Sequence, residues 1–463
     1  MNWRGKMYQY PNGNVFYRKL DGDLPICVKG EGIYLYDQEG KKYIDGTGGP
    51  LCVTIGHGIS EIAEAAEAQA KQIAYVHGSQ FTTLAIEEFT KKLAKVLPSG
   101  IDKIYPVGSG SEANETALKL ARQYQLSLGN SQRYKVIGRW FSYHGSTLGS
   151  LSMMGKVSFR KPYLPLLLDF PHIPAPYCYR CPFEKTYPQC KILCARFLEK
   201  MIELEGPETI SAFIAEPIIG STLGAVVPPK EYYRIIREIC DKYNILFIAD
   251  EVMSGYGRTG KWFALDHWGV VPDIVTMGKG ISSGYVPLAA MAVKKEIVDV
   301  IKEKGDNFVH GYTFSHHPVS SAVGLAVLNY MEKHDLVEKS AARGKYLYEK
   351  LEELKEKFFF IGDVRGKGLM IGIEFVKDKD SKVPFPRKIL FKEKIQKKSF
   401  EKGLYIYSTT TGMVDGINGD GIIIAPPYII QEQEIDKIVD ILKEVFLEIE
   451  KGLQTTLPGK VID

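Results

Sequence analysis

Residues 245–280 read ILFIADEVMSGYGRTGKWFALDHWGVVPDIVTMGKG, and they contain two short apolar segments, 245–249 and 274–277. Each segment has the length of a buried strand, and a charged residue follows each closely. Asp250 comes directly after the first segment, and Lys279 comes two residues after the second. Ligands of open α/β sheets bind at the carboxyl ends of the strands. The pattern therefore places an acid and a lysine at the ligand-binding edge of a predicted sheet.

The same pattern extends toward the N-terminus. Apolar segments at 101–107, 134–137 and 212–215 predict further buried strands, and helical patterns cover 60–74 and 111–127. Strands and helices that alternate on this scale imply βαβ units and a mostly parallel sheet. We expect an α/β fold.

The two ends of the chain follow other patterns. Residues 32–45 alternate apolar and polar side chains around a polar turn, which predicts a β-hairpin. A helix over 320–331, a strand over 370–375 and an amphipathic helix around 435–446 follow the α/β region. We predict a large α/β domain at 58–330, a smaller α+β domain at 331–463, and an N-terminal segment at 1–57 that packs with the smaller domain.

Composition excludes some classes of function. The 463 residues are 45% hydrophobic and 25% charged, as in ordinary soluble proteins, and the net charge of +4 argues against nucleic-acid binding through bulk charge. No unbroken apolar stretch reaches the ~18 residues of a membrane span. Residues 1–14 lack the apolar core of a secretory signal, and the seven cysteines are an odd number. We expect a cytoplasmic protein with neither nucleic acid nor membrane as a partner.

Four of the cysteines are closely spaced. Cys178, Cys181, Cys190 and Cys194 follow the pattern C-x2-C-x8-C-x3-C, whose spacing can bind zinc. The alternative is a surface loop with reduced thiols, or one joined by disulfides under oxidising conditions. The spacing leaves metal binding open.

Two segments near the strand ends can bind anionic or aromatic groups. In GSGSEAN, residues 108–114, the small residues around Gly110 and Ser111 let backbone amides at a helix N-terminus approach a phosphate. A turn that merely caps the helix is an equally good reading. Tyr143, in the segment after the strand at 134–137, can stack on a heteroaromatic ring, although packing alone also explains it.

Asp250 and Lys279 are the more informative pair. A carboxylate at a buried strand end is costly unless it has a partner, and a protonated ring nitrogen would be one. A metal is a weaker alternative for Asp250 because no histidine cluster accompanies it. Lys279 stands between Gly278 and Gly280, which leave room for a bulky group. Burial would lower the lysine pKa, as imine formation with a carbonyl cofactor requires, whereas a lone GKG is often an exposed loop.

Eight segments together resemble the class III (fold type I) pyridoxal-phosphate-dependent aminotransferases over nearly the full chain. The resemblance implies the fold of that family, a large domain with a mostly parallel sheet and a smaller α+β domain. The segments occur in the family's order: GIYLYDQEGKKYIDGTGG (32–49), GSGSEANETALK (108–119), FSYHG (141–145), IAEPIIG (214–220), ADEVMSGYGRTG (249–260), TMGKGISSGYVPLAA (276–290), GYTFSHHPV (311–319) and DVRGKGLMIGIE (363–374).

The resemblance also implies roles for the matching residues. Lys279 would hold pyridoxal phosphate as a Schiff base and move the proton between the substrate's Cα and the cofactor. Asp250 would pair with the pyridinium nitrogen, and Tyr143 would stack on one ring face. The remaining cofactor contacts implied are Gly110 and Ser111 at the phosphate, Val252 on the other ring face, and His144 and Glu216 at the cofactor's edge. Thr313 would reach the phosphate bound in the neighbouring subunit, which implies a homodimer with shared sites.

The activity implied is ping-pong transfer of an amino group from an amine donor to a 2-oxo acid. Two departures bear on the donor. No arginine precedes Ala425-Pro426-Pro427, and Met253 stands where one branch of the family has glutamine. Both changes favour the branch that uses ω-amines or β-amino acids. Arg365, or a lysine or arginine within 402–421, is the expected partner of the acceptor's carboxylate.

The loop at 175–194 is an insertion that resembles one in enzymes acting on β-amino acyl-CoA thioesters. Its Arg180, Lys185 and Lys191 would then contact phosphates, and a solvated loop is the alternative. The same scaffold also hosts an aminomutase and a dialkylglycine decarboxylase. A non-catalytic binding module that has lost the cofactor is the alternative outside enzymes.

Overall fold

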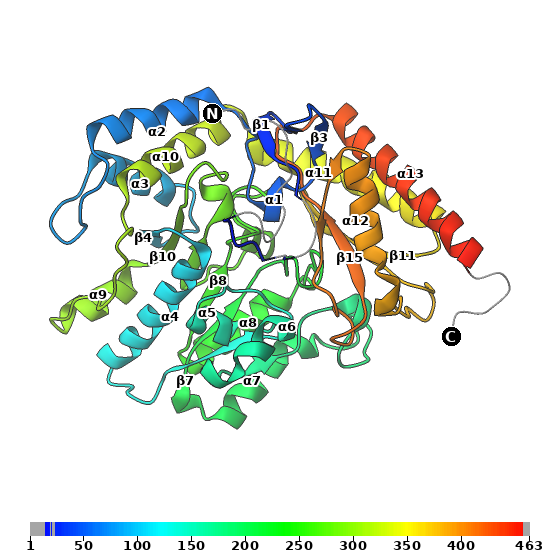
Figure 1. The fold of residues 1–463 in the computed structure, drawn as a ribbon. Helices are drawn as coiled ribbons and strands as arrows, with labels where there is room; N and C mark the ends of the chain where they lie inside the picture. The colour runs from blue at the N-terminus through cyan, green and yellow to red at the C-terminus, as the bar shows by residue number, and fades with distance from the viewer. Residues whose placement is uncertain (1–13, 19, 21–23, 457–463) are drawn as a thin grey trace.

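The largest sheet of the computed structural model has seven strands, in the order β4-β10-β9-β8-β7-β5-β6. Figure 1 labels β4, β10, β8 and β7 of this sheet. The structure describes residues 14–18, 20 and 24–456. The strands are β4 (Ile101–Val107), β5 (Lys135–Arg139), β6 (His172–Ile173), β7 (Ile210–Ala215), β8 (Leu246–Asp250), β9 (Ile274–Met277) and β10 (Ala289–Lys294). All neighbouring pairs from β6 to β9 are parallel, and β10 is antiparallel to both β9 and β4. The predicted mostly parallel sheet is confirmed.

The central strands are apolar along their whole length because helices cover both faces of the sheet. Alternate residues of a strand point to opposite faces. Phe213 and Phe247 pack on one face with α7 (Leu193–Glu205) and α8 (Tyr232–Tyr243). The neighbouring residues Ile214 and Ile248 pack on the other face with α4 (Gly110–Ser127) and α9 (Lys295–Glu303).

Two four-stranded sheets lie beside the large one. One has the order β1-β2-β3-β13, from β1 (Cys27–Glu31), β2 (Tyr34–Asp37), β3 (Lys42–Asp45) and β13 (Leu404–Tyr405). The other has the order β11-β12-β15-β14, from β11 (Ile361–Lys367), β12 (Met370–Phe375), β15 (Asp420–Ile424) and β14 (Tyr407–Ser408). The predicted hairpin is β2–β3, and its strand β3 pairs in parallel with β13 of the C-terminal region.

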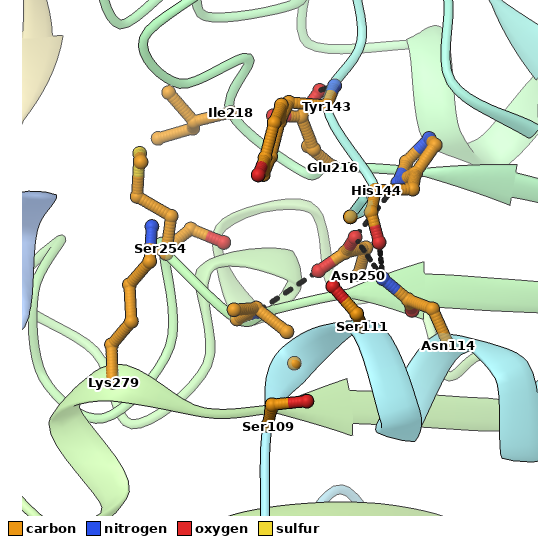
Figure 2. Close-up of a pocket in the computed structure, with 14 residues that line it drawn as sticks. Ser109, Ser111, Asn114, Tyr143, His144, Glu216, Ile218, Asp250, Ser254 and Lys279 are labelled. Carbon is orange, nitrogen blue, oxygen red and sulfur yellow. Dashed lines mark hydrogen bonds and ion pairs between the residues drawn. The ribbon is translucent and has the colours of Figure 1, made fainter. Parts of the chain in front are cut away.

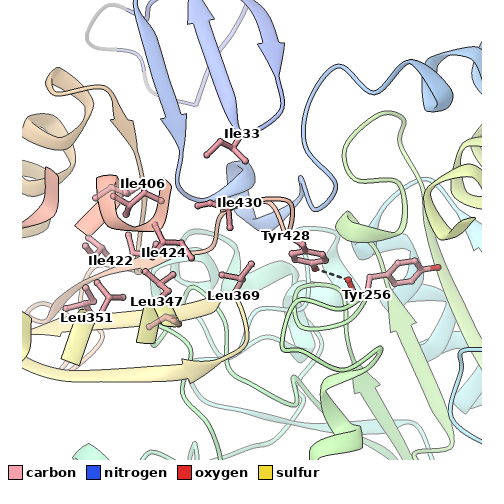
Figure 3. Close-up of a cluster of buried hydrophobic side chains, with 14 of the residues drawn as sticks. Ile33, Tyr256, Leu347, Leu351, Leu369, Ile406, Ile422, Ile424, Tyr428 and Ile430 are labelled. Carbon is pink, nitrogen blue, oxygen red and sulfur yellow. Dashed lines mark hydrogen bonds between the residues drawn. The ribbon is translucent and has the colours of Figure 1, made fainter. Parts of the chain in front are cut away.

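A continuous apolar cluster connects these sheets with the helices around them. It includes Ile33 from the N-terminal region and Leu347 and Ile424 from the C-terminal region, all of which Figure 3 shows side by side. In the same cluster the Tyr428 hydroxyl donates a hydrogen bond to the Tyr256 carbonyl oxygen, 2.8 Å away. The boundaries at 57/58 and 330/331 stay predictions.

The other helices fill the space around the three sheets. The predicted helices at 60–74 and 320–331 are α2 (Ser60–Gln72) and α10 (Pro318–Lys333), and the C-terminal one is α13 (Glu432–Thr456). The remaining helices are α1 (Gly48–Leu51), α3 (Leu84–Ala94), α5 (Leu148–Met153), α6 (Val157–Arg160), α11 (Leu336–Lys357) and α12 (Phe391–Glu401), with short 3-10 turns at Lys161–Leu166, Cys178–Arg180, Pro207–Thr209, Ala264–Trp268, Lys279–Ile281 and Arg387–Ile389.

Two predictions concern the absence of a membrane-spanning segment and the absence of a secretory signal. Within the described residues, none of the helices combines the length and the apolar composition that a membrane crossing needs. The polar segment at 1–14, on which the prediction about a secretory signal rests, lies outside the described residues except for Asn14.

Candidate active site

The carboxyl ends of β8 and β9 and the N-terminus of α4 meet at one cavity of about 180 Å³ (Figure 2). The predicted residues at these three places, Asp250, Lys279 and Ser111, all line it. Further predicted residues in its lining are Gly110, Tyr143, His144, Glu216 and Val252. The structure therefore brings together residues that are up to 169 positions apart in the chain, from Gly110 to Lys279.

Asp250 is held in place from two sides. Its Oδ2 lies 2.7 Å from Nδ1 of His144 and accepts a hydrogen bond from the Asn114 side-chain amide at 2.8 Å. Its Oδ1 accepts one backbone bond, from the Val252 amide at 3.1 Å. Only 3% of Asp250 is exposed. These bonds satisfy the buried carboxylate and fix it with an oxygen toward the cavity, where a protonated ring nitrogen can pair with it.

Asn114 is a site residue that the sequence reasoning missed. Its amide also donates to the His144 carbonyl oxygen at 2.6 Å, and its own oxygen accepts a bond from the Thr276 hydroxyl at 2.7 Å. Asn114 is buried on α4, on the helix face that packs against the sheet. A polar residue among the buried positions of an amphipathic helix is the signal that marks it.

Lys279 follows β9 and points into the same cavity as Asp250 (Figure 2). Its backbone has φ +47°, a left-handed conformation that is unusual for a residue with a side chain and that is concentrated at functional sites. Burial lowers the pKa of Lys279 to about 8, although Cys52, Asp250 and Glu216 oppose the shift. Within the described part of the chain the amine has no hydrogen-bond or ion-pair partner. It is therefore a nucleophile with room to react.

The N-terminus of α4 forms a cradle of small residues. Ser109 caps the helix by accepting a bond from the Glu112 amide, and the Ser111 hydroxyl accepts one from the Ser146 amide at 3.1 Å. A Cβ on Gly110 would lie 2.7 Å from Val252, so only glycine fits there. A helix N-terminus with free amides and close backbone approach binds phosphate well.

Tyr143 and Glu216 complete the wall opposite Lys279 (Figure 2). The Tyr143 amide donates to Glu216 Oε2 at 3.3 Å, and the Gly220 amide donates to Glu216 Oε1 at 3.2 Å. Burial raises the pKa of Glu216. Ile218 and Met253 add apolar surface to the lining.

Thr313 does not line this cavity. It lines a second one, of about 460 Å³, together with His77, Tyr105 and His316. The Thr313 carbonyl oxygen accepts a bond from the Tyr75 hydroxyl at 2.7 Å, and its side chain is free to meet another chain. Its contact with a neighbouring subunit stays a prediction.

The predicted partners of an acceptor carboxylate are paired with acidic side chains in this structure. The Arg365 guanidinium lies 2.8 Å from both Asp363 and Glu374 and also donates to the carbonyl oxygens of Leu223 and Gly224. The Arg365 guanidinium is thus paired with acidic side chains inside the protein, and Arg365 does not line the Lys279 cavity. The one basic residue of 402–421 is Lys402, which pairs with Glu444 and Glu448 on α13.

Arg180 of the inserted loop pairs with the same carboxylate as Arg365, that of Glu374. Its Nε lies 2.6 Å from Glu374 Oε1, and the Glu374 side chain is fully buried. The arginine therefore anchors the loop to β12 through Nε, and its contact with a phosphate stays a prediction. Lys185 and Lys191 are exposed, and contact between them and a phosphate stays a prediction.

The four clustered cysteines surround a small cavity of about 20 Å³. All four are free thiols, and in the described residues no group of three or more His, Cys, Asp and Glu side chains is arranged to hold a metal ion. Burial, with help from Cys178 and Cys190, raises the pKa of the Cys194 thiol to about 12. The zinc alternative has no geometric support.

The residues of the Lys279 cavity fit pyridoxal phosphate group by group. The cradle at Gly110 suits the phosphate, the fixed carboxylate of Asp250 suits the ring nitrogen, and the unpartnered amine of Lys279 suits the aldehyde. Each of these groups is supplied by a different element, α4, β8 and the turn after β9. A cofactor that carries a phosphate, a ring nitrogen and an aldehyde on one aromatic ring requires such groups to converge on one cavity.

Comparisons with known proteins agree with this chemistry. The family model described as "Aminotransferase class-III" matches residues 18–446. The uncharacterized aminotransferase YodT of Bacillus subtilis is 40% identical, with 94% of this chain and 98% of that protein covered. A putrescine–pyruvate aminotransferase of Pseudomonas aeruginosa is 37% identical, with 90% of each chain covered. A solved (S)-enantioselective omega-transaminase from Thermomicrobium roseum is 38% identical, with TM-score 0.86 and coverage of 92% and 93%.

Proposed function

The chain belongs to the class-III aminotransferase family, and we propose that it moves an amino group from an amine, ω-amino or β-amino donor to a 2-oxo acid. The transaminase class is that of its relatives and structural neighbours. The observation that carries the proposal is the unpartnered Lys279 amine, which faces the same cavity as Asp250 and the N-terminus of α4. The proposal adds the roles of these residues and the kind of donor.

Bound pyridoxal phosphate supplies an electron sink, which makes a proton on the substrate's amine-bearing carbon acidic enough to be removed. The side chains must then move that proton and keep the ring oriented. Lys279, with a pKa lowered to about 8, is suited to take the proton and return it, because a general base works best when its pKa lies near the working pH.

Asp250 maintains the positive charge at the ring nitrogen. His144 and Asn114 hold its carboxylate in one orientation, so no reorientation is needed during the reaction. Tyr143 and Val252 line the cavity from separate loops and are placed to pack against a ring. The amides at Gly110 and Ser111 would anchor the phosphate.

The lining of the cavity supports a donor without an α-carboxylate. Ile218 and Met253 are apolar, and Arg365 is paired elsewhere. Among the residues that line the cavity, Lys279 is the sole lysine or arginine, and it is the residue that would hold the cofactor. An amine, an ω-amino acid or a β-amino acid places an apolar or remote group where an α-amino acid would place a charge.

A homodimer and a cytoplasmic location belong to the proposal as well. Thr313 lies in an exposed loop after His310 and lines a cavity separate from that of Lys279. That placement supports a role toward the phosphate of a neighbouring subunit. Sedimentation of the wild-type enzyme and of Thr313→Ala, with and without cofactor, tests this part.

The activity is tested by a single half-reaction. The cofactor-loaded enzyme is mixed with one donor and no acceptor, across simple amines, ω-amino acids and β-amino acids. We expect the cofactor absorbance to shift to that of its amine form, with one ketone or aldehyde released per active site. Turnover of donor beyond one equivalent without acceptor would contradict the proposal, because an aminomutase needs no acceptor.

A further inference from the structure

A third cavity, of about 530 Å³, lies beside the active site and is separate from the cavity of Thr313. Positively charged side chains line it. Three cations come from distant parts of the chain: Arg18 from the N-terminal region, Lys156 from the residue before α6, and Lys392 from α12. Its volume falls within the range typical of small-molecule sites. We call it the basic cavity.

The three cations face one another. Burial and the charges of Arg18 and Lys392 together lower the pKa of Lys156 to about 8. The Lys156 amine lies 3.6 Å from the centre of the Phe159 ring, and the Arg18 guanidinium carbon lies 5.5 Å from it. The positive charges of Arg18 and Lys156, which share the Phe159 ring, repel each other, and an anion between them would relieve the repulsion.

Nearby carboxylates do not neutralise these cations. Glu393 lines the basic cavity, but both of its oxygens are bonded to Arg387, at 2.7 and 2.9 Å. Asp420 acts on Lys392 electrostatically, and its own pKa is raised by burial. Among the described residues, none of Arg18, Lys156 and Lys392 makes an ion pair, and Lys392 donates its bond to the Thr409 carbonyl oxygen at 2.6 Å.

Hydroxyl groups complete the lining. Ser221, Ser408, Thr410 and Thr411 all reach the basic cavity. The Thr410 hydroxyl is buried and has no hydrogen-bond partner. A buried hydroxyl without a partner loses free energy, so this group marks a position where a ligand oxygen would be bound.

The basic cavity touches the active site through one aromatic contact. The Lys156 amine lies 5.6 Å from the centre of the Tyr143 ring, and Phe159 packs edge-on against the same ring at 6.1 Å. Tyr143 lines the cavity of Lys279, and the two cavities share no lining residue. A group bound among the cations would therefore lie in a different cavity from Lys279, and Tyr143 contacts residues of both.

We propose that the basic cavity binds a second anionic group of the substrate, a carboxylate or a phosphate ester, remote from the carbon that reacts at Lys279. This inference rests on the proposed function. It identifies the substrate class as an elongated molecule that carries a negative charge at the end far from the reacting carbon. Arg18, Lys156 and Lys392 then supply the positive charge that Arg365 does not.

Two matched substrate pairs test the proposal on the cofactor-loaded enzyme. The carboxylate pair is 2-oxoglutarate and its ester with methanol at the distal carboxylate. The phosphate pair is 3-aminobutyryl-CoA and the corresponding N-acetylcysteamine thioester, which lacks the phosphates. For one pair we expect wild-type kcat/KM to be about tenfold or more higher for the anionic member, the size of one hydrogen bond to a charged group. The pair that shows the preference identifies the source of the anion.

Lys156→Met and the milder Arg18→Gln should each reduce that preference through KM, while the member without the distal anion reacts as with the wild type. Lys156→Arg should retain most of it. Lys443→Met, at an exposed position on α13, is the control for loss of one positive charge and should change nothing. Calorimetric titration with glutarate or coenzyme A provides a readout independent of turnover, and Lys156→Met should weaken binding of the matching probe.

A wild-type enzyme that prefers neither anionic member, or a preference that survives in both Lys156→Met and Arg18→Gln, would overturn the proposal. Both outcomes still include reaction of the members without the distal anion. Failure of the proposed function looks different, because then none of the amines, ω-amino acids and β-amino acids of the half-reaction screen would convert the cofactor to its amine form.

Discussion

The active-site cavity and the basic cavity treat charge in opposite ways. In the first, the buried carboxylate of Asp250 is satisfied by His144 and Asn114 before any ligand arrives. In the second, Lys156 and Lys392 face each other and Arg18 without an acid to pair with among the described residues. A pre-bonded carboxylate needs only one further partner, whereas unpaired cations require a ligand that brings negative charge.

The difference separates the common chemistry from the choice of substrate. Strand ends and a helix N-terminus, which the fold holds rigidly, build the Lys279 cavity and serve every substrate alike. The basic cavity is assembled from the N-terminal segment, the residue before α6, and α12. Changes to Lys279 and Asp250 should affect all substrates equally, and changes in the basic cavity should affect them selectively.

The largest effect is expected from Lys279→Ala. Loss of the group that transfers the proton should lower kcat by about 10⁴-fold or more for every donor and acceptor. The cofactor should still bind noncovalently through its phosphate and Asp250, as its absorbance in the purified variant would show. A variant that lost activity with only some substrates would break the division between the two cavities.

Asp250→Asn tests the same cavity more gently. The amide fills the same space but cannot hold a positive ring nitrogen, so we expect kcat to fall roughly 10²–10³-fold for all substrates, as when one preorganised electrostatic partner is removed. Steady-state rates with two donors and two acceptors measure this. Asn114→Asp, which brings a second carboxylate beside Asp250, should also lower the rate, while unchanged kinetics in both variants would remove Asp250 from the mechanism.

The pH dependence of cofactor attachment should report Lys279 itself. Because burial lowers the pKa of this amine from 10.5 to about 8, its protonated form is lost at lower pH than in an exposed lysine. At saturating pyridoxal phosphate, the rate of covalent attachment to the apoenzyme should rise about tenfold per pH unit below 8 and level off above it, since only the neutral amine attacks. Stopped-flow absorbance follows the reaction. A rate that still climbs beyond pH 10 would indicate an ordinary lysine.

The smallest effect on turnover is expected from Glu374→Gln, which tests the paired arginines against the unpaired cations. Two arginines within 2.8 Å favour the charged form of Glu374, although burial raises its pKa. Its replacement leaves Arg180 and Arg365 without their shared partner and should cost up to about 3–5 kcal/mol of folding stability, while kcat/KM changes little for any substrate. Chemical denaturation measures the loss. Glu448→Gln, at an exposed pair with Lys398, is the control and should change stability little. A selective change in acceptor preference for Glu374→Gln would return Arg365 to the substrate.

The parts of the site that the sequence predicts are those set by local pattern. Asp250 and Lys279 follow apolar segments of strand length, and the fold then needs only the rule that strand ends carry ligands. Strand β10 went unpredicted because its Ala-rich sequence has weak strand propensity, and its place between β4 and β9 depends on pairing partners far along the chain.

The parts that the sequence does not predict depend on long-range contacts. Asn114 acquires its role from Asp250, 136 positions away. Arg365 looks like a free cation until the β11–β12 hairpin places Glu374 opposite Asp363, within reach of the arginine. Lys156 belongs to no recognisable sequence motif. Its proposed role in binding an anion follows only from the fold, which brings Arg18 and Lys392 to the same cavity.

The central claim is that Lys279 holds the cofactor, and borohydride reduction followed by peptide mass analysis tests it most directly. The purified enzyme, loaded with pyridoxal phosphate and reduced, should lose its visible absorbance and carry the mass of one phosphopyridoxyl group on the peptide containing Lys279. Label on another lysine, or absorbance that survives reduction with no labelled peptide, would contradict the account.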